Sequence, residues 1–350
     1  MSIYRIKHVP FDEKAKLVSF LDNHWKKGHA LAVSDALLDF QHANAGDKTY
    51  NFIAGENLVT GEYDALIGYI PVAQFDDSLA ANGDYWGAIW KIREDVHNDE
   101  INNVGFFIWK QLFKLPYFQS YGAIGISPIA EQIYTASRMD TGYLNHYFIL
   151  NERACDFRIA RNVDRRHMEN RPYNAPTSEY SVTWSDSESL RRLSVKSLYR
   201  PYKSIDYMMN KYAGHPIYNY RFLCVRRGNA VIGIWVARLL ELNGSRILRV
   251  VDVLGELGGN LYGELQAIMA HDNLEYIDFL NYGIDKEVFE TMGFSMLDFD
   301  GGLVIPNYFE PYEPRNVKIE LAYKAKYDNY VMFKGDSDQD RPNIIPNDHE

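Results

Sequence analysis

The apolar residues of this chain fall into short runs that occur in the same order in both halves. Residues 66–73 form a run with glycine at the third position, and residues 231–238 repeat that arrangement. Both runs are rich in β-branched and aromatic residues, which is typical of β-strands. A second run of this kind follows in each half, at residues 86–93 and 246–253. We therefore predict two consecutive strands in each half.

A helix is expected after each second strand, and each helix starts at a similar four-residue segment that begins with asparagine. The segments are Asn102-Asn103-Val104-Gly105 and Asn260-Leu261-Tyr262-Gly263. Asparagine is a favoured helix N-cap, so we expect the helices to begin at these segments. A short apolar strand and a final helix then follow in each half, at residues 122–126, 276–280, 129–137 and 286–292.

The repeated order of strand, strand, helix, strand and helix indicates an internal duplication, because an ordered series is hard to obtain by chance. It predicts an α/β fold class, a mixed sheet with helices on both faces, built twice. We place one domain at residues 1–155 and the other at residues 181–334, joined by a linker at residues 156–180. Residues 335–350 are rich in Asp, Pro and Asn without apolar periodicity, so they are predicted to form a flexible tail.

The length of 350 residues and the 46% apolar content agree with two hydrophobic cores. No run approaches the ~20 apolar residues of a membrane span, and the first residues lack a signal-peptide pattern. Cys155 and Cys224 are too few for a disulfide framework, and we expect both to be buried thiols. These features predict a cytoplasmic protein without a membrane span.

The formal net charge of −10 argues against nucleic acid as the main partner, because such binding depends on Lys and Arg at the phosphates. One basic patch lies in and near the predicted linker and consists of Arg158, Arg161, Arg165, Arg166, His167 and Arg171. It is either a solvated connector or a docking site for the phosphates of a nucleotide-linked substrate. No cluster of His, Asp and Glu has metal-ligand spacing, so no metal is expected.

The repeated order of elements resembles the core of the GNAT superfamily of N-acetyltransferases. In that family, a helix N-terminus after the fourth strand holds the pyrophosphate of acetyl-coenzyme A (acetyl-CoA), through a loop of the form Gln/Arg-x-x-Gly-x-Gly/Ala. The resemblance implies two tandem GNAT-like domains, with acetyl-CoA or another acyl-CoA bound at Asn102, Asn103, Val104 and Gly105. Neither segment has the leading Gln or Arg, and Phe107 and Leu265 stand at the second small position.

A second pattern of the family, Asn-x-x-Ala-x-x-Leu-Tyr, resembles residues 127–134, with Ser127 at its first position and Tyr134 at its last. The resemblance implies that Ser127 contributes to the cofactor site and that Tyr134 protonates the leaving sulfur. Phe289 stands at the corresponding position of the second half and has no hydroxyl, which favours the first half as the active one. The alternative is that Tyr134 is an ordinary aromatic residue on a buried helix face.

A general base is expected near the end of the fourth strand of the first half, where Glu94, Asp95 and His97 cluster. Asp95 is our candidate, although a charged surface turn also explains this cluster. In the second half, Asp252 lies inside an apolar run, where a carboxylate needs a partner. We expect Asp252 to pair with Arg249 or another arginine, and the alternative is that it orients a substrate amine.

These features predict an acyl-CoA-dependent N-acyltransferase. The chain looks similar to two-domain GNAT-like proteins encoded with bacterial surface-polysaccharide genes, which implies an amino group of a sugar nucleotide or a related small precursor as the acceptor. The polar aromatic residues 211–220 suit a sugar site, or equally a helix end before a strand. Two alternatives remain open: a non-catalytic pair of domains that binds a ligand or partner, and a Fem-like aminoacyltransferase that uses aminoacyl-tRNA. A homodimer also stays open.

Overall fold

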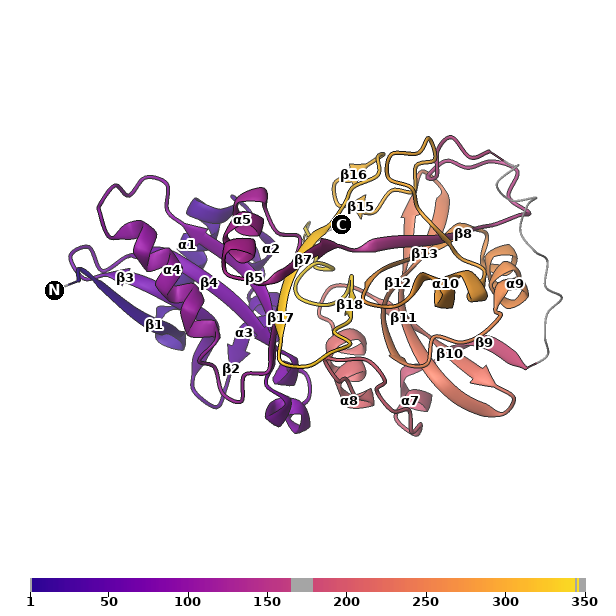
Figure 1. The fold of residues 1–350 in the computed structure, drawn as a ribbon, viewed down its shortest axis with the longest axis horizontal. Coiled ribbons are helices and arrows are strands. Elements are labelled where there is room, and N and C mark those ends of the chain that lie inside the picture. The colour runs from indigo at the N-terminus through magenta and orange to yellow at the C-terminus, as the bar shows by residue number, and fades with distance from the viewer. Residues whose placement is uncertain (1, 165–178, 344, 346–350) are drawn as a thin grey trace.

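The computed structural model describes residues 2–164, 179–343 and 345, and two mixed sheets form its framework (Figure 1). The first sheet has the strand order β1-β3-β4-β5-β6-β17-β7, with β2 paired to β3. Its strands are β1 (Tyr4–Pro10), β2 (Ala43–Asn44), β3 (Thr49–Asn57), β4 (Tyr63–Pro71), β5 (Asp84–Ile92), β6 (Ser120–Ile124), β7 (Asp140–Tyr143) and β17 (Glu320–Ala325).

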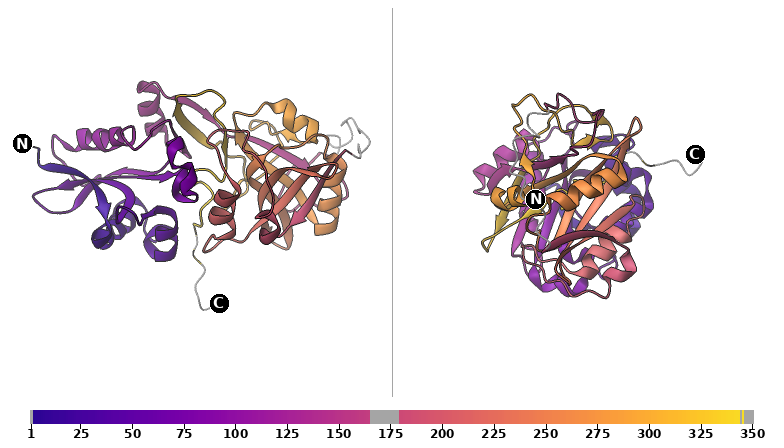
Figure 2. Two further views of the ribbon diagram at one scale, coloured as in Figure 1. Left: turned by 90° about the horizontal axis from the view of Figure 1, so that it is seen from below. Right: turned by 90° about the vertical axis from the view of Figure 1, so that its right-hand side faces the viewer.

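The second sheet has the strand order β14-β8-β13-β12-β11-β10-β9, with β18 paired to β13. Its strands are β8 (Asn145–Leu150), β9 (Tyr180–Ser185), β10 (Tyr220–Arg227), β11 (Ala230–Leu242), β12 (Ser245–Gly255), β13 (Leu274–Tyr282), β14 (Ser295–Met296) and β18 (Met332–Phe333). A small separate hairpin is formed by β15 (Tyr308–Phe309) and β16 (Tyr312–Glu313). The two sheets lie side by side along the long axis of the molecule (Figure 2).

Helices cover both faces of the first sheet. Successive strand residues point to opposite faces, so Ile67 of β4 packs in one core with Ile108, whereas its neighbour Leu66 packs in another core with Leu17 and Leu38. The first core includes α4 (Ile101–Leu112) and α5 (Pro128–Ala136), and the second includes α1 (Lys14–Phe20), α2 (Ala30–Val33) and α3 (Asp35–His42). The predicted α/β class with helices on both faces is confirmed.

The second sheet is covered in the same way. Val250 of β12 packs with Leu265 and Phe289, while its neighbour Val251 packs with Met208 on the other face. The helices of this half are α7 (Ser187–Leu190), α8 (Ile205–Met208), α9 (Tyr262–Asp272) and α10 (Lys286–Met292). None of the described helices is long and apolar enough to cross a membrane.

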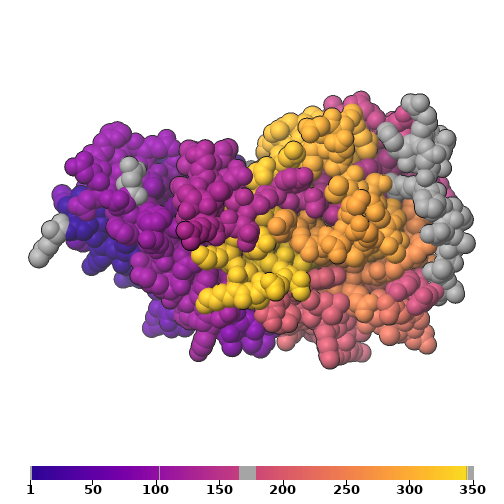
Figure 3. Space-filling model, in the orientation of Figure 1, coloured from indigo at the N-terminus to yellow at the C-terminus, as the bar shows by residue number. Residues whose placement is uncertain are grey.

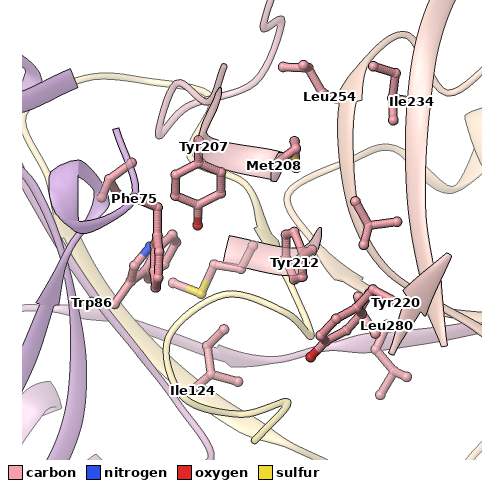
Figure 4. Close-up of a cluster of buried hydrophobic side chains, with 14 of the residues drawn as sticks. Phe75, Trp86, Ile124, Tyr207, Met208, Tyr212, Tyr220, Ile234, Leu254 and Leu280 are labelled. Atoms are coloured by element: carbon pink, nitrogen blue, oxygen red, sulfur yellow. The ribbon is translucent and has the colours of Figure 1, made fainter. Parts of the chain in front are cut away.

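One hydrophobic core joins the two halves (Figure 4). It combines residues of the first sheet, of the second sheet and of the segment around α8: Ile70, Trp86, Ile124, Ile234, Leu254, Leu280, Tyr207, Met208 and Tyr212. All of these side chains are buried. This shared apolar core holds the halves together, and polar contacts such as the hydrogen bond from the Asn210 amide to the Phe75 carbonyl at 2.8 Å add to it.

The chain also exchanges strands between the sheets. β8 directly follows β7 but pairs with β13 of the second sheet, and β17 returns to pair with β6 and β7 of the first sheet. In Figure 1, β8 runs from the first half into the second, and β17 lies in the first sheet next to the junction. Each sheet thus contains one strand that comes from the other half of the sequence.

Residues 334–343 are packed between the halves, although the sequence predicts a flexible tail from residue 335. Asp336, Ser337 and Asp338 are buried, and the C-terminal part of the chain, in yellow, lies at the junction in Figure 3. Polar contacts rather than apolar periodicity hold this segment, because Asp336 forms an ion pair with Lys203 at 2.7 Å. Residues 344 and 346–350 of the predicted tail lie outside the described residues.

Candidate functional site

The candidate site is an opening in the first sheet where two parallel strands separate. β5 and β6 pair only through Asp84–Ser120, Tyr85–Tyr121 and Trp86–Gly122. Beyond Trp86, β5 continues to Ile92 and pairs only with β4. The chain leaves both strands at this opening to form α4 and α5. In open α/β sheets, ligands bind outside the carboxyl ends of such strands.

An apolar slot of about 320 Å³ lies at this opening. β5 contributes Trp90, Lys91 and Ile92, and the start of α5 contributes the opposite wall: Ser127, Ile129, Ala130 and Ile133. Trp25 also lines the slot, and its side chain is 39% exposed. Ile129 is 71% exposed, so an aliphatic side chain stands at the mouth in contact with water. Exposed apolar groups gathered around a hollow are a feature of ligand sites.

Tyr134 lies in the core directly next to this slot. Its ring centroid is 5.8 Å from that of Trp90, and its hydroxyl is 3.3 Å from the Tyr121 hydroxyl. A Cβ atom added at Gly87 would lie 2.2 Å from the Tyr121 hydroxyl, so this hydroxyl pair sits beside the point where β5 leaves β6. Burial raises the pKa of Tyr134 to about 12. Tyr134 is therefore neutral at pH 7 and can donate a proton but cannot accept one.

Ser127 is the N-cap of α5. Its Oγ accepts a hydrogen bond from the Ala130 backbone N–H at 3.2 Å, and Pro128 occupies the first position of the helix. The cap uses the oxygen as an acceptor and leaves the hydroxyl proton for another partner. Ser127 and Tyr134, both predicted site residues, are thus brought to the same helix beside the slot.

The segment of residues 102–105 lies inside α4 rather than in front of it. The helix begins at Ile101, and its N-cap, Glu100, makes no side-chain cap hydrogen bond, so the expectation of an asparagine cap at this segment is wrong. The Asn98 side chain instead accepts a hydrogen bond from the Glu100 backbone N–H at 3.0 Å. Asn102 and Asn103 therefore occupy the first turn, where backbone N–H groups have no partner within the helix.

Val104 and Gly105 pack the helix onto the sheet. A Cβ atom at Gly55 would lie 2.3 Å from Val104, and a Cβ atom at Gly105 would lie 2.1 Å from Ile92. Glycine at these two positions lets α4 approach the strands closely. The position of Gly105 is thus explained by helix packing without any ligand.

The turn between β5 and α4 borders a second, polar cavity of about 580 Å³. Arg93 is the cation in its lining, while Glu94 and Asp99 contribute negative charge. Carboxylates near a helix N-terminus stabilise the helix but oppose a bound phosphate. The electrostatics of this turn are therefore less favourable for a pyrophosphate than the family pattern implies.

Asp95 is exposed on this turn and forms two hydrogen bonds with Arg93, at 3.0 and 2.7 Å. These hydrogen bonds lower the pKa of Asp95 to about 2. A carboxylate with so low a pKa is a weak proton acceptor at neutral pH. Asp95 does not line the apolar slot, so the structure does not bring it together with Tyr134.

The corresponding opening of the second sheet is occupied by the chain itself. β12 and β13 pair as far as Val250–Phe279 and then separate. Lys334 and Gly335 enter here: the Lys334 N–H donates to the Leu280 carbonyl at 3.2 Å, and the Gly335 N–H donates to the Val251 carbonyl at 2.7 Å. The two halves therefore differ, because only the first has an apolar slot at its opening among the described residues.

The buried charges of the second half correct one expectation. Asp252 is bound by Lys203 at 2.5 Å and by the Tyr212 hydroxyl at 2.7 Å, not by Arg249. Arg249 pairs instead with Asp278 at 2.6 Å. The prediction that Asp252 pairs with an arginine was wrong. Its partner Lys203 lies about fifty residues away in the sequence, so no local pattern indicates the pair.

Several other predictions concern single residues. Phe289 is buried and stacks on Tyr147, with ring centroids 3.8 Å apart, so it belongs to a packed core.

Cys224 is buried as expected, whereas Cys155 is exposed, so the expectation of two buried thiols was wrong. No group of three metal-binding side chains occurs among the described residues. In the basic patch, Arg158 and Arg161 are described, but Arg165, Arg166, His167 and Arg171 lie outside the described residues.

Apart from Ser127, the residues that line the slot were not predicted from the sequence. Trp90 and Ile92 belong to a predicted strand, and their apolar character alone does not distinguish a slot wall from a core. Trp25 lies about 65 positions before Trp90, and no periodicity links the two. Two tryptophans, Trp90 and Trp109, could have indicated an aromatic wall near Tyr134. Their rings stack with centroids 5.9 Å apart, and Trp109 also contacts Tyr134.

Comparison with known proteins identifies the fold. No family model and no curated protein matches the sequence. Among solved structures, a GCN5-related N-acetyltransferase from Anabaena variabilis is similar over 92% of this chain and 72% of its own, with a TM-score of 0.53 and 8% identity. This chain has the GNAT fold.

Weaker similarities involve two further solved structures. A putative acetyltransferase from Pyrococcus horikoshii is similar over 94% of this chain and 92% of its own, with a TM-score of 0.46 and 10% identity. N-myristoyltransferase from Saccharomyces cerevisiae, with bound myristoyl-CoA, is similar over 95% of this chain and 80% of its own, with a TM-score of 0.43 and 10% identity. At such identities, similarity concerns the fold and not the activity.

Proposed function

We propose that this chain is an acyl-CoA-dependent N-acyltransferase whose donor site is the β5–β6 opening of the first sheet. The observation that carries the proposal is the apolar slot at the ends of two separating strands in a GNAT fold. The acyl and pantetheine part of the donor is narrow and partly apolar, so it suits walls made by Trp90, Ile129 and Ile133. The second half serves as a packing partner, because its own opening holds Lys334 and Gly335.

The proposed reaction is transfer of an acyl group from a thioester to an amine. The amine nitrogen attacks the carbonyl carbon, a C–N bond forms, the C–S bond breaks, and the sulfur leaves as a thiolate. The amine loses one proton to water, and the thiolate gains one proton. Tyr134 would supply that proton and regain one from solvent, because it is neutral at pH 7 and shares a hydrogen bond with Tyr121.

The pyrophosphate of the donor would lie at the first turn of α4. Backbone N–H groups of Asn102 and Asn103 lack partners within the helix, and Arg93 is the nearby cation. Arg93 already binds Asp64 and Asp95, so it would have to be shared with the phosphates. The contribution of Ser127 stays a prediction. The assignment of Asp95 as the general base also stays a prediction, and the low pKa of Asp95 and its position outside the slot weigh against it.

The acceptor we propose is an amino group on a sugar nucleotide or a related small precursor. The choice of acceptor rests on the resemblance to tandem GNAT-like proteins of surface-polysaccharide gene clusters. We also propose that the enzyme is cytoplasmic and forms a homodimer. The acidic turn before α4 favours one second candidate, in which the two halves bind a ligand or partner without catalysis. No observation favours a Fem-like aminoacyltransferase.

The deciding experiment is calorimetric titration with acetyl-CoA and with desulfo-CoA. Ile129→Asp changes an exposed residue at the slot mouth, and Val59→Asp is its matched control, an aliphatic residue that is 79% exposed and outside the slot. Loss of an apolar contact worth ~1.5–3 kcal/mol predicts binding about 10- to 100-fold weaker for the first variant only. Absence of binding by the unmodified protein would refute the proposal, and binding without transfer to any amine would support the second candidate.

A further inference from the structure

A second cavity, small and polar, lies where the C-terminal segment meets the second sheet. Its volume is about 40 Å³, and Lys334, Asn307, Gln339 and Arg341 are among the residues that line it. A cavity needs ~10–15 Å³ to hold one water molecule, so there is room for a few waters or for a ligand of a few non-hydrogen atoms. It is separate from the β5–β6 slot and has no residue in common with it.

One of the four cations that line this cavity makes no ion pair among the described residues. Arg238 pairs with Asp340 at 3.0 Å and with Glu310 at 3.5 Å, Arg249 pairs with Asp278, and Arg341 pairs with Asp338. The Lys334 side chain lines the cavity, the residue is 4% exposed, and no described carboxylate lies within 4 Å of its amine. Its Nζ lies 5.1 Å from the ring centroid of Tyr308. A buried lysine without a counter-ion either loses its proton or keeps it when an anion approaches.

Three buried polar atoms of the lining also lack hydrogen-bond partners: Asn307 Oδ1, Gln339 Oε1 and Arg341 Nε. Asn307 is 1% exposed, and its Nδ2 donates to the Val317 carbonyl at 2.7 Å, which orients its oxygen as a free acceptor. Each unsatisfied buried group costs about 1–3 kcal/mol. Two acceptors, one donor and one ammonium group thus belong to residues that line the same small cavity.

We propose that this cavity binds a small α-hydroxy carboxylate of the size of glycolate. The Lys334 ammonium, which has no described carboxylate within 4 Å, would pair with the single negative charge of this ligand. The carboxylate would accept hydrogen bonds from the Lys334 ammonium and from Arg341 Nε–H, and the hydroxyl would donate to Asn307 Oδ1 or Gln339 Oε1. This inference does not depend on the proposed acyltransferase activity, because the two sites use different residues.

The site also adjoins the first half. A Cβ atom at Gly125, directly after β6, would lie 2.2 Å from Gln339 Oε1. Ser337, two residues before Gln339, donates a hydrogen bond from its hydroxyl to the Gly87 carbonyl of β5. A ligand held by Gln339 and Arg341 would therefore restrain the segment that borders the β5–β6 opening.

The test is calorimetric titration of the full chain with glycolate, with glycolamide as the neutral control of the same shape. We expect glycolate to bind and glycolamide not to bind. Lys334→Met keeps the length of the side chain and removes the charge, and should weaken glycolate binding at least about tenfold. Lys318→Met is the matched control, because Lys318 does not line the cavity, and it should leave binding unchanged.

If Lys334→Met fails to fold, Gln339→Glu serves instead, because it keeps the shape and places a negative charge beside the carboxylate. It should also abolish binding. The proposal is overturned if the unmodified protein does not bind glycolate, if glycolamide binds equally well, if inorganic phosphate binds in place of glycolate, or if the variants bind like the control.

The pH dependence gives an independent readout. Burial, together with Arg249 and Arg238, lowers the pKa of Lys334 to about 7, and Asp340 and Asp278 oppose this shift. The amine must carry a proton to attract the carboxylate. Binding should therefore be strong at pH 6 and weaken about tenfold per pH unit above pH 7. A binding constant that does not change between pH 6 and pH 9 would contradict a role for Lys334.

Discussion

The ion pairs of Lys203 offer a sharp test of how the C-terminal segment is held. Its amine lies 2.5 Å from Asp252 of β12 and 2.7 Å from Asp336 of the segment, and all three side chains are buried. Lys203→Met removes the cation that the two carboxylates share. Breaking a buried ion pair by removing one partner costs about 3–5 kcal/mol, and we expect a loss in this range.

The assay is urea unfolding followed by circular dichroism, with Lys286→Met as the control. Lys286 pairs with Glu290 on the exposed surface of α10, and both side chains are about half exposed. Exposed pairs of this spacing contribute ~0.3–0.5 kcal/mol, so the control should unfold almost like the unmodified protein. If Lys203→Met and Lys286→Met changed the free energy of unfolding equally, the buried ion pairs of Lys203 would not hold the C-terminal segment.

The loss should also depend on pH. Burial raises the pKa of Asp336, so this carboxyl binds a proton more readily in the folded chain than in the unfolded chain. Without Lys203, the folded state therefore gains stability as the pH falls toward that raised pKa. The difference between the two proteins should shrink between pH 7 and pH 4.5. In Lys203→Met, hydrogen exchange should become faster at the Lys334 and Gly335 amides. A loss of less than ~1 kcal/mol in the free energy of unfolding, with unchanged hydrogen exchange, would refute this reasoning.

Three further predictions can be checked separately. Gly233→Ala should lower the free energy of unfolding by about 1–3 kcal/mol, because the added Cβ would lie 1.9 Å from the Glu256 carbonyl oxygen. Gly302→Ala is the control: its added Cβ has free space, so the variant should unfold like the unmodified protein in the same urea experiment. Asp95→Asn should keep the acyltransferase rate within about tenfold, because Arg93 holds the pKa of Asp95 at about 2, and a loss of 10²-fold or more would instead establish it as the general base. A thiol reagent such as Ellman's should titrate Cys155 in the folded protein and Cys224 only after unfolding, and equal reactivity before unfolding would contradict the burial of Cys224.

The elements that depend on local pattern could be predicted from the sequence. The runs at 66–73 and 231–238 correspond to β4 (Tyr63–Pro71) and β11 (Ala230–Leu242), because strands buried on both faces appear as nearly continuous runs of apolar, β-branched and aromatic residues. The helix predicted at residues 129–137 corresponds to α5 (Pro128–Ala136), which begins one residue earlier. The start of α4 was misjudged because the helix begins at Ile101, after the N-cap Glu100, so the asparagines of the segment lie inside its first turn.

The features that depend on distant partners could not be predicted. The exchange of β8 and β17 between the sheets follows from pairing choices made across more than a hundred residues, which no local period encodes. The segment after residue 334 looks like a disordered tail by composition, because its burial is stabilised by Lys203 and by backbone carbonyls of β12 and β13. For the same reason, Lys334 was not recognised as a candidate binding residue.

The segment of residues 334–341 distinguishes the two sheets. It fills the opening of the second sheet with Lys334 and Gly335, and it reaches the first sheet through the Ser337 hydroxyl at Gly87 and through Gln339 beside Gly125. A single segment thus closes one opening and borders the other, while an apolar slot stays open at Trp90. In the proposed function the acyl donor would enter this slot, and Tyr134 would act there as the proton donor that Phe289 cannot be. The asymmetry of the two halves is therefore a property of packing as well as of sequence.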